Sequence, residues 1–310
     1  MKKLGVLLAA LFLIAVGALG GYLYAEKKAE EKFKTKVERT LAEAGLKGRV
    51  KVGGYSVSLI KKEASLENVR VEPGVKDYGD FLVELKVIKK ISFLDYKEDP
   101  ELKVPTSLKA AFEGIELFIK DKKKGAELPL KLSGLLSYSY SPRKGFLSAS
   151  FTLNGNLFDF ETSLALAGVE PSLLEGFKEL SDSRPSPFDP SFALFMSRLL
   201  QVKPLRLELL YYDRGFYRRS GELLFGPQGF ERGVKELEKM VREEENPCLK
   251  TLLSSLLRAA KEGRGGFKVE LVNTGGLSLQ DFGILTATAG TPEGLVKLLA
   301  GKVKIRVTSL

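Results

Sequence analysis

Apolar and polar residues alternate along much of the chain after residue 48, the pattern of half-buried β-strands. The longest run spans 128–140, where most even-numbered positions are apolar, and similar runs follow at 147–153 and 158–166. Asn154-Gly155 joins the last two runs and is a strong hairpin signal. The three runs predict an antiparallel meander with one apolar and one polar face. The apolar face, in contact with lipid or with a core, is expected to include Leu132, Tyr138, Phe151 and Phe160.

Helical spacing interrupts the alternation. Between 192 and 200 apolar residues recur at i, i+3, i+4, i+7 and i+8, which predicts an amphipathic helix. Two further stripes lie at 230–241 and 249–257, separated by Asn246-Pro247, and Thr291-Pro292 has the capping residue and proline of a helix start. Alternating segments at 205–211, 267–271 and 303–307 predict strands between these helices.

The expected divisions of the chain follow from these changes of period. They are a transmembrane anchor at 4–24, a juxtamembrane helix at 25–45, a β-meander domain at 48–166, a helical and proline-rich linker at 167–202, and an α+β domain at 203–310.

Residues 4–24 form an uncharged apolar run of 21 residues. At 1.5 Å per residue such a helix spans about 30 Å, the thickness of the hydrocarbon core of a bilayer. The run predicts a single-pass protein of the inner membrane with its carboxy-terminal body in the periplasm. A cleaved signal peptide is the alternative. A count of the basic residues on the two flanks of the run would favour the opposite orientation in the membrane, because more of them follow residue 26 than precede residue 4.

Composition removes several kinds of chemistry. The chain has no histidine and one cysteine, Cys248, which excludes Ser-His-Asp and Cys-His catalysis, imidazole metal sites and an intrachain disulfide. Neither GxSxG nor a phosphate-binding P-loop is present, so we expect a non-enzymatic protein without cofactor or metal. Asp213 and Gly215 are expected to form a structural turn after the strand that ends at 212. The chain has only five Asn and three Gln but 49 Lys and Arg, a composition that is typical of hyperthermophile proteins.

The charge is unevenly distributed. Of the net charge of +10, residues 1–150 carry +9, from 28 basic and 19 acidic side chains. This excess favours a phospholipid or membrane surface as partner, although a solvated lysine-rich surface gives the same count. The interspersed acidic residues and the expected anchor argue against nucleic acid.

Two segments carry a family resemblance. The sequences GYSVSL at 54–59 and ASLENVRV at 64–71 resemble the start of AsmA-like envelope proteins, and LLYYDRGF at 209–216 with the elements after it is similar to periplasmic proteins of the YdgA kind. The resemblance implies an inner-membrane anchor, a curved antiparallel sheet with an apolar face, and a part in envelope lipid homeostasis with envelope proteins as further partners.

Together these observations predict an α+β fold: an N-terminal transmembrane helix, a mainly antiparallel, curved β-sheet domain and a smaller mixed α/β C-terminal domain. The expected function is to bind or shield lipid acyl chains without enzymatic activity. The alternative is an envelope assembly scaffold, a protein-interaction module with a closed core. An apolar groove left unfilled would distinguish the first from the second.

Overall fold

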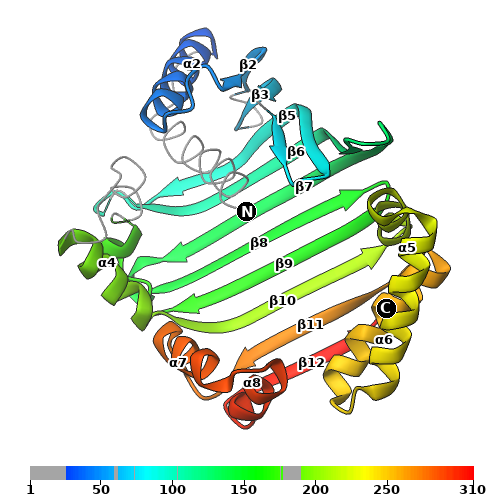
Figure 1. Cartoon of the computed structure of the whole chain (residues 1–310). Coiled ribbons are helices and arrows are strands. Elements are labelled where there is room, and N and C mark those ends of the chain that lie inside the picture. The colour runs from blue at the N-terminus through cyan, green and yellow to red at the C-terminus, as the bar shows by residue number, and fades with distance from the viewer. Residues whose placement is uncertain (1–25, 59–61, 73, 103, 175, 177–189) are drawn as a thin grey trace.

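The computed structural model describes residues 26–310 except 59–61, 73, 103, 175 and 177–189. In this part of the chain twelve strands form one sheet (Figure 1), in the order β1-β3-β5-β6-β7-β8-β9-β10-β11-β12, with β2 also paired to β3 and β4 to β5. The strands are β1 (Val50–Lys51), β2 (Gly54–Ser58), β3 (Glu63–Val71), β4 (Val75–Asp77), β5 (Phe81–Glu98), β6 (Pro105–Asp121), β7 (Glu127–Ser141), β8 (Phe146–Gly155), β9 (Phe158–Ala167), β10 (Lys203–Asp213), β11 (Gly265–Asn273) and β12 (Val303–Ser309).

The carboxy-terminal strands continue the sheet of the meander, and this corrects the predicted fold class. β10 pairs antiparallel with β9 from Lys203↔Ala167 to Asp213↔Phe158, and β11 and β12 follow in the same sense. The protein is therefore a mostly antiparallel twelve-stranded sheet with few helices, and the smaller mixed α/β unit expected after residue 203 is wrong. The physical reason is that β10 satisfies its backbone groups on the free edge of β9.

No helix among the described residues is long and apolar enough to cross a membrane. The anchor expected at 4–24 lies outside those residues. The predicted single-pass location in the inner membrane is thus unsupported, and we correct it on this finding.

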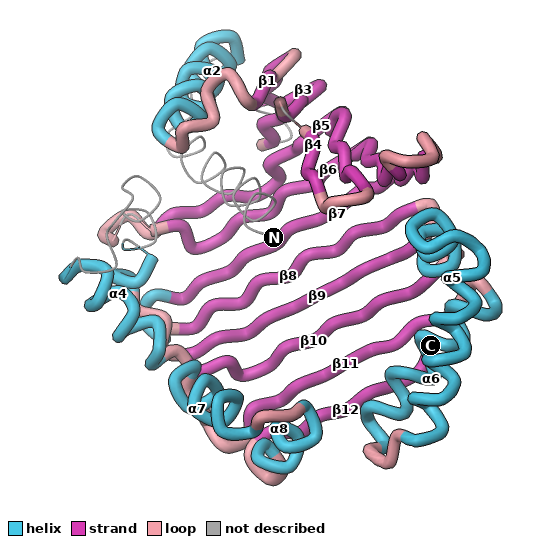
Figure 2. The backbone as a smooth tube through the Cα atoms, in the orientation of Figure 1, coloured by secondary structure: helices cyan, strands magenta, loops and turns pink. Residues whose placement is uncertain are grey.

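Apart from α2, the labelled helices lie near the two ends of the strands (Figures 1 and 2). One end carries α4 (Pro190–Gln201), α7 (Leu279–Ala289) and α8 (Pro292–Leu299), and the other carries α5 (Phe216–Glu243) and α6 (Pro247–Glu262). A non-helical residue, Gly226, divides α5 just before Pro227. The two parts of α5 meet where the Tyr217 and Phe230 rings lie 6.3 Å apart.

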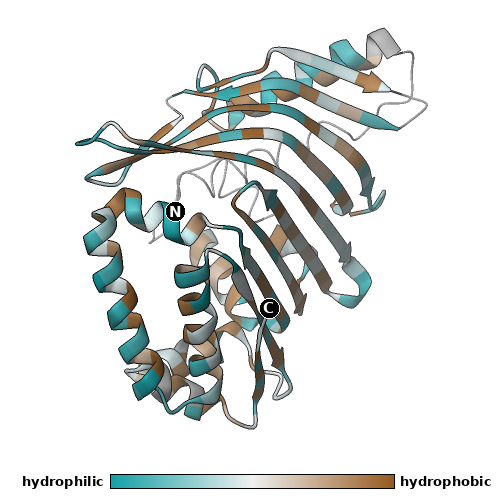
Figure 3. Ribbon diagram, turned by 90° about the vertical axis from the view of Figure 1, so that its right-hand side faces the viewer, coloured by the Kyte–Doolittle hydropathy of each residue, from teal (hydrophilic) through white to brown (hydrophobic). Residues whose placement is uncertain are grey.

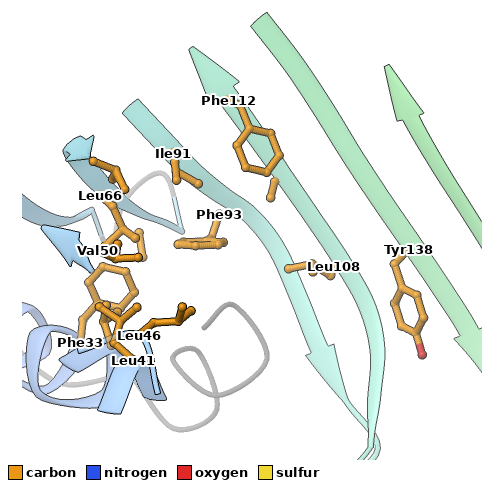
Figure 4. Close-up of a cluster of buried hydrophobic side chains, with 14 of the residues drawn as sticks. Phe33, Leu41, Leu46, Val50, Leu66, Ile91, Phe93, Leu108, Phe112 and Tyr138 are labelled. Carbon is orange, nitrogen blue, oxygen red and sulfur yellow. The ribbon is translucent and has the colours of Figure 1, made fainter. Parts of the chain in front are cut away.

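Two separate clusters of buried side chains hold the sheet and helices together. In the larger one, α2 (Glu26–Glu43) inserts Phe33 against Phe93 of β5, with ring centroids 6.1 Å apart (Figure 4). This cluster continues along the sheet to Tyr138, Tyr140 and Phe195 of α4. The smaller cluster packs the side chains of Phe216, Leu223 and Leu224 of α5 against β6 and β7, where it buries Ile119, Leu128, Leu130 and Leu132.

The last strand, β12, borders the sheet beside α6. The thiol of Cys248, at the start of α6, lies 3.7 Å from the carbonyl oxygen of Ile305 in β12. Lys304 and Arg306 flank Ile305 and are exposed. The start of α6 therefore packs against β12, and the helix also contacts β11.

Candidate functional site

The register of the strands assembles one apolar face from residues far apart in sequence. Residues paired directly across antiparallel strands lie on the same side of a sheet. In one row across the sheet each residue pairs with the next on the neighbouring strand. This row runs through Leu136, Phe151, Thr162, Leu209, Val269 and Val307. The neighbouring row pairs Tyr138, Ala149, Leu164, Leu207, Leu271 and Ile305. Figure 3 shows the resulting hydrophobic bands along the curved sheet.

The opposite face of the same strands is polar and its groups are paired. The hydroxyl oxygens of Ser137 and Ser150 lie 2.6 Å apart. Glu208 is bridged by Arg206 at 2.7 Å and by Lys268 at 2.9 Å, and the hydrogen bond from Lys268 lowers the pKa of the Glu208 carboxyl. This face is therefore suited to water, whereas the apolar face is not.

The middle of the apolar face belongs to neither buried cluster. We call this region the open stripe, and it consists of Phe151, Phe160, Leu164, Leu207, Leu209 and Leu271. Its side chains are half-buried, except that Leu207 is 37% exposed. Among the described helices, none crosses the middle of β8 and β9 in Figure 1. Apolar side chains thus remain in contact with solvent between two closed ends.

A single polar side chain interrupts the rows of the open stripe, and its polar group is already satisfied. The hydroxyl of Thr162 donates to the carbonyl oxygen of Glu208 at 3.0 Å. The stripe therefore presents hydrocarbon and aromatic surface and offers a ligand little to hydrogen-bond.

The four apolar residues expected at the site divide into two pairs. Leu132 and Tyr138 are each 8% exposed and belong to the two buried clusters, so they are core. Phe151 and Phe160 are half-buried members of the open stripe. Sequence reasoning assigned all four to one face without separating core from open surface, and it did not single out Leu207 or Leu209.

Asp213 and Gly215 lie where the open stripe meets α5. Asp213 is fully buried and its carboxylate accepts hydrogen bonds from the Gly215 N–H at 2.6 Å and the Tyr217 N–H at 2.9 Å. Gly215 has a φ of 104°, a conformation that favours glycine. The hydroxyl of Tyr211 donates to the same carboxylate at 2.5 Å, and burial followed by this hydrogen bond raises the pKa of Tyr211. The carboxylate thus fixes the start of α5, and its contacts are structural.

Aromatic rings close this end of the stripe. Phe158 lies 5.0 Å from Phe216 of α5 and 6.2 Å from Tyr211, and Tyr211 lies 5.7 Å from Phe267, all between ring centroids. These rings form an apolar wall at the end of the stripe nearest α5.

A hollow of about 480 Å³ lies away from the open stripe, between β3, β4 and β5. Its lining mixes Arg70 and Lys86 with Glu72, Glu84 and Glu116. Lys86 places its ammonium 4.0 Å from the centre of the Phe118 ring. Charges of both signs already face one another there, so the hollow has no single chemical preference.

Within the described part of the chain, no group of three acidic or cysteine side chains is placed to hold a metal ion. No family model matches this chain, and a search of curated proteins also finds no match. The resemblance to AsmA-like and YdgA-like proteins stays a hypothesis.

Proposed function

We propose that the protein is a non-enzymatic binder of lipid acyl chains, which lie on the open stripe. The observation that carries the proposal is the set of half-buried apolar side chains on β8, β9 and β10, between two clusters that are already closed. A hydrocarbon chain would remove this surface and its own methylene groups from water together, at about 0.8 kcal/mol per buried methylene.

The chemistry of the stripe supports an acyl chain better than a polar ligand. Thr162, the polar residue between Phe151 and Leu209, is engaged with the backbone of Glu208. The charged side chains of these strands, such as Arg206 and Lys268, alternate onto the opposite face. A ligand that needed several hydrogen bonds would therefore lose its hydration without replacement.

The test compares two adjacent leucines of β10. Leu209 lies on the apolar face beside Thr162 and Val269, whereas Leu210 lies on the polar face beside Glu161 and Lys268. Both are half-buried in the same strand. Leu209→Glu should weaken binding of a fluorescent anthroyloxy fatty acid to the purified full-length chain at least tenfold, and Leu210→Glu should leave it within about twofold.

Lipid extracted from the purified wild-type chain and identified by mass spectrometry gives an independent measurement. The rest of the chain is identical in both variants, so a difference between them belongs to this face. Leu207→Glu, at the more exposed position, repeats the test if Leu209→Glu fails to fold. Equal binding by the Leu207→Glu and Leu210→Glu variants, with no lipid in the extract, would refute the proposal and leave a protein partner for this surface.

A further inference from the structure

Exposed apolar side chains lie on α4, α7 and α8, at one end of the sheet. Leu194 is 53% exposed, Ile284 57% and Leu298 38%. None of the residues of α7 is buried, and Asp281 is its only charged residue. We call the exposed side of these three helices the apolar rim, and we propose that it docks on the surface of a lipid bilayer.

The rim is one assembled surface. The backbone N–H of Leu279, at the start of α7, donates to the carbonyl of Val202 after α4 at 2.8 Å, and Gln201 and Gln280 are joined by a hydrogen bond of 3.3 Å. Figures 1 and 2 show the three helices along the same end of the strands. Leu199 on the inner side of α4 packs on the larger buried cluster, so the rim is anchored to the sheet from within.

The charges around the rim favour anionic headgroups. Residues 190–204 and 274–303, which contain the three helices and their connections, hold four basic residues and two acidic ones. Asp281 is engaged locally, because its carboxylate accepts hydrogen bonds from the N–H and hydroxyl of Ser278 at 2.8 Å. These bonds, with nearby Lys302 and Lys203, lower the pKa of Asp281. Apolar helix faces flanked by lysine and arginine are typical of binding at a membrane interface.

A second copy of the chain fits the rim less well. The exposed side chains are distributed over three helices rather than gathered in one groove. A two-fold contact would also place two surfaces with the same excess of basic residues opposite each other, and like charges facing each other across an interface are unfavourable. A bilayer imposes neither requirement, since its headgroups rearrange around the docked surface.

The role of this docking rests on the proposed function: the rim would present the end of the open stripe to a source of acyl chains. Its test does not rest on that function, because the binding of a free fatty acid at Leu209 is measured without vesicles. A negative result in one of the two binding measurements therefore does not change the conclusion from the other.

The experiment places a fluorescent reporter at each end of the sheet in the full-length chain. Cys248 is the single cysteine, so Cys248→Ala gives a background for Ile284→Cys on the rim and Phe225→Cys on α5. Phe225 is a stringent control because it is also an exposed apolar residue beside positive charge. It is 71% exposed, and the next residue, Gly226, lies near the ammonium of Lys124. Each cysteine is labelled with the environment-sensitive dye NBD and mixed with vesicles of phosphatidylglycerol and phosphatidylcholine.

We expect the emission of the label at 284 to shift to the blue and its quenching by iodide to fall several-fold, while the label at 225 stays accessible. Each label reports only its own surroundings, whichever other part of the chain meets the vesicle. Raising the salt concentration or omitting phosphatidylglycerol should reduce the change at 284. Equal protection at both positions, or none at 284, overturns the proposal. Protection at 284 that rises with protein concentration without vesicles also overturns it and assigns the rim to a second copy.

Discussion

The two ends of the sheet are closed by helices of different chemistry. At one end α5 carries eleven charged side chains and α6 four, including the contacting pair Lys261 and Glu238. At the other end α4 and α7 carry one each and α8 two. The first pair of helices exposes Phe225 and Met240 among many charged side chains, whereas the second group exposes leucine and isoleucine among few.

The two ends also differ in how firmly their helices are attached. α5 begins at the buried carboxylate of Asp213 and its first part packs on the smaller buried cluster. α7 begins at a capping box formed by Ser278 and Asp281 and buries none of its own residues. Covering an apolar sheet and holding the cover in place are therefore separate tasks. α7 contributes only half-buried residues such as Leu279 to the cover.

The largest expected effect is the loss of stability when the carboxylate at the start of α5 is removed, compared with the one at the start of α7. Asp213→Ala leaves the Gly215 and Tyr217 N–H groups without their acceptor in a fully buried place, and it should lower the free energy of unfolding by roughly 3–5 kcal/mol. Asp281→Ala, at the exposed cap of α7, should cost much less, because water can replace the lost contacts. Urea denaturation followed by circular dichroism measures both. Similar losses would show that the two ends are equally dependent on their caps.

A second prediction compares a covered and an uncovered leucine on the apolar face. Leu130 is 4% exposed under α5, and Leu130→Ala should cost about 2–5 kcal/mol because a cavity is left. Leu209 lies in the open stripe, and Leu209→Ala should cost about 1 kcal/mol. Thermal unfolding of the two variants gives the comparison. A loss at Leu209 as large as that at Leu130 would mean that the stripe is closed.

Amide hydrogen exchange should be slower in α6 than in α7. Ser255, Ala259 and Ala260 are buried in α6, whereas α7 has no buried residue. The amides of α7 should therefore open with a free energy lower than those of α6 by more than about 1 kcal/mol, as measured by exchange and mass spectrometry. Anionic vesicles should slow exchange in α7 if the rim docks there. Equal protection in the two helices without vesicles would contradict the prediction.

The smallest expected difference concerns alkaline pH. The hydroxyl of Tyr140 donates to the carbonyl of Val169 at 2.9 Å, and burial, with Glu170 nearby, raises the pKa of Tyr140 to about 12. A pKa raised above the unfolded value near 10 means that this contribution to stability is complete below about pH 10 and is lost as the pH rises through about 12.

Tyr140→Phe keeps the ring and removes the ionisation, so its stability should fall less steeply than that of the wild type between about pH 9 and pH 11. Urea midpoints across this range provide the measurement. Parallel pH profiles for the two proteins would indicate that Tyr140 ionises as freely in the folded as in the unfolded chain.

Much of the local structure follows from residue periodicity. The alternation at 128–140 predicted a strand that the structure places at Glu127–Ser141, and the helical spacing at 192–200 lies within α4, Pro190–Gln201. Asn246-Pro247 and Thr291-Pro292 do begin helices. These signals are local, since each depends on which residues share one face of one element.

The sequence was less informative where partners are distant or absent. That β10 would pair with β9 across some 35 residues depends on which strand edge is free, and alternation does not encode this choice. Leu132 and Phe151 lie on the same face of the sheet, so alternation could not separate core from open stripe. α7 was missed because its half-buried residues Leu279, Phe282 and Leu285 are mixed with exposed apolar residues such as Ile284, which obscures the helical period. The spacing of Ser278 and Asp281 is the signal that could have found it.

The contact between Cys248 and Ile305 has a consequence for how copies of this chain avoid one another. A long open sheet ends in an edge strand whose unpaired backbone groups can recruit strands from other molecules, and fibre growth by edge-to-edge pairing is the usual result. Here the thiol of Cys248, at the start of α6, contacts one carbonyl oxygen of β12, while Lys304 and Arg306 put positive charge along the strand. A second copy approaching edge to edge would find that carbonyl oxygen engaged and would bring like charges together. The protein can thus keep a broad apolar face without polymerising through this edge.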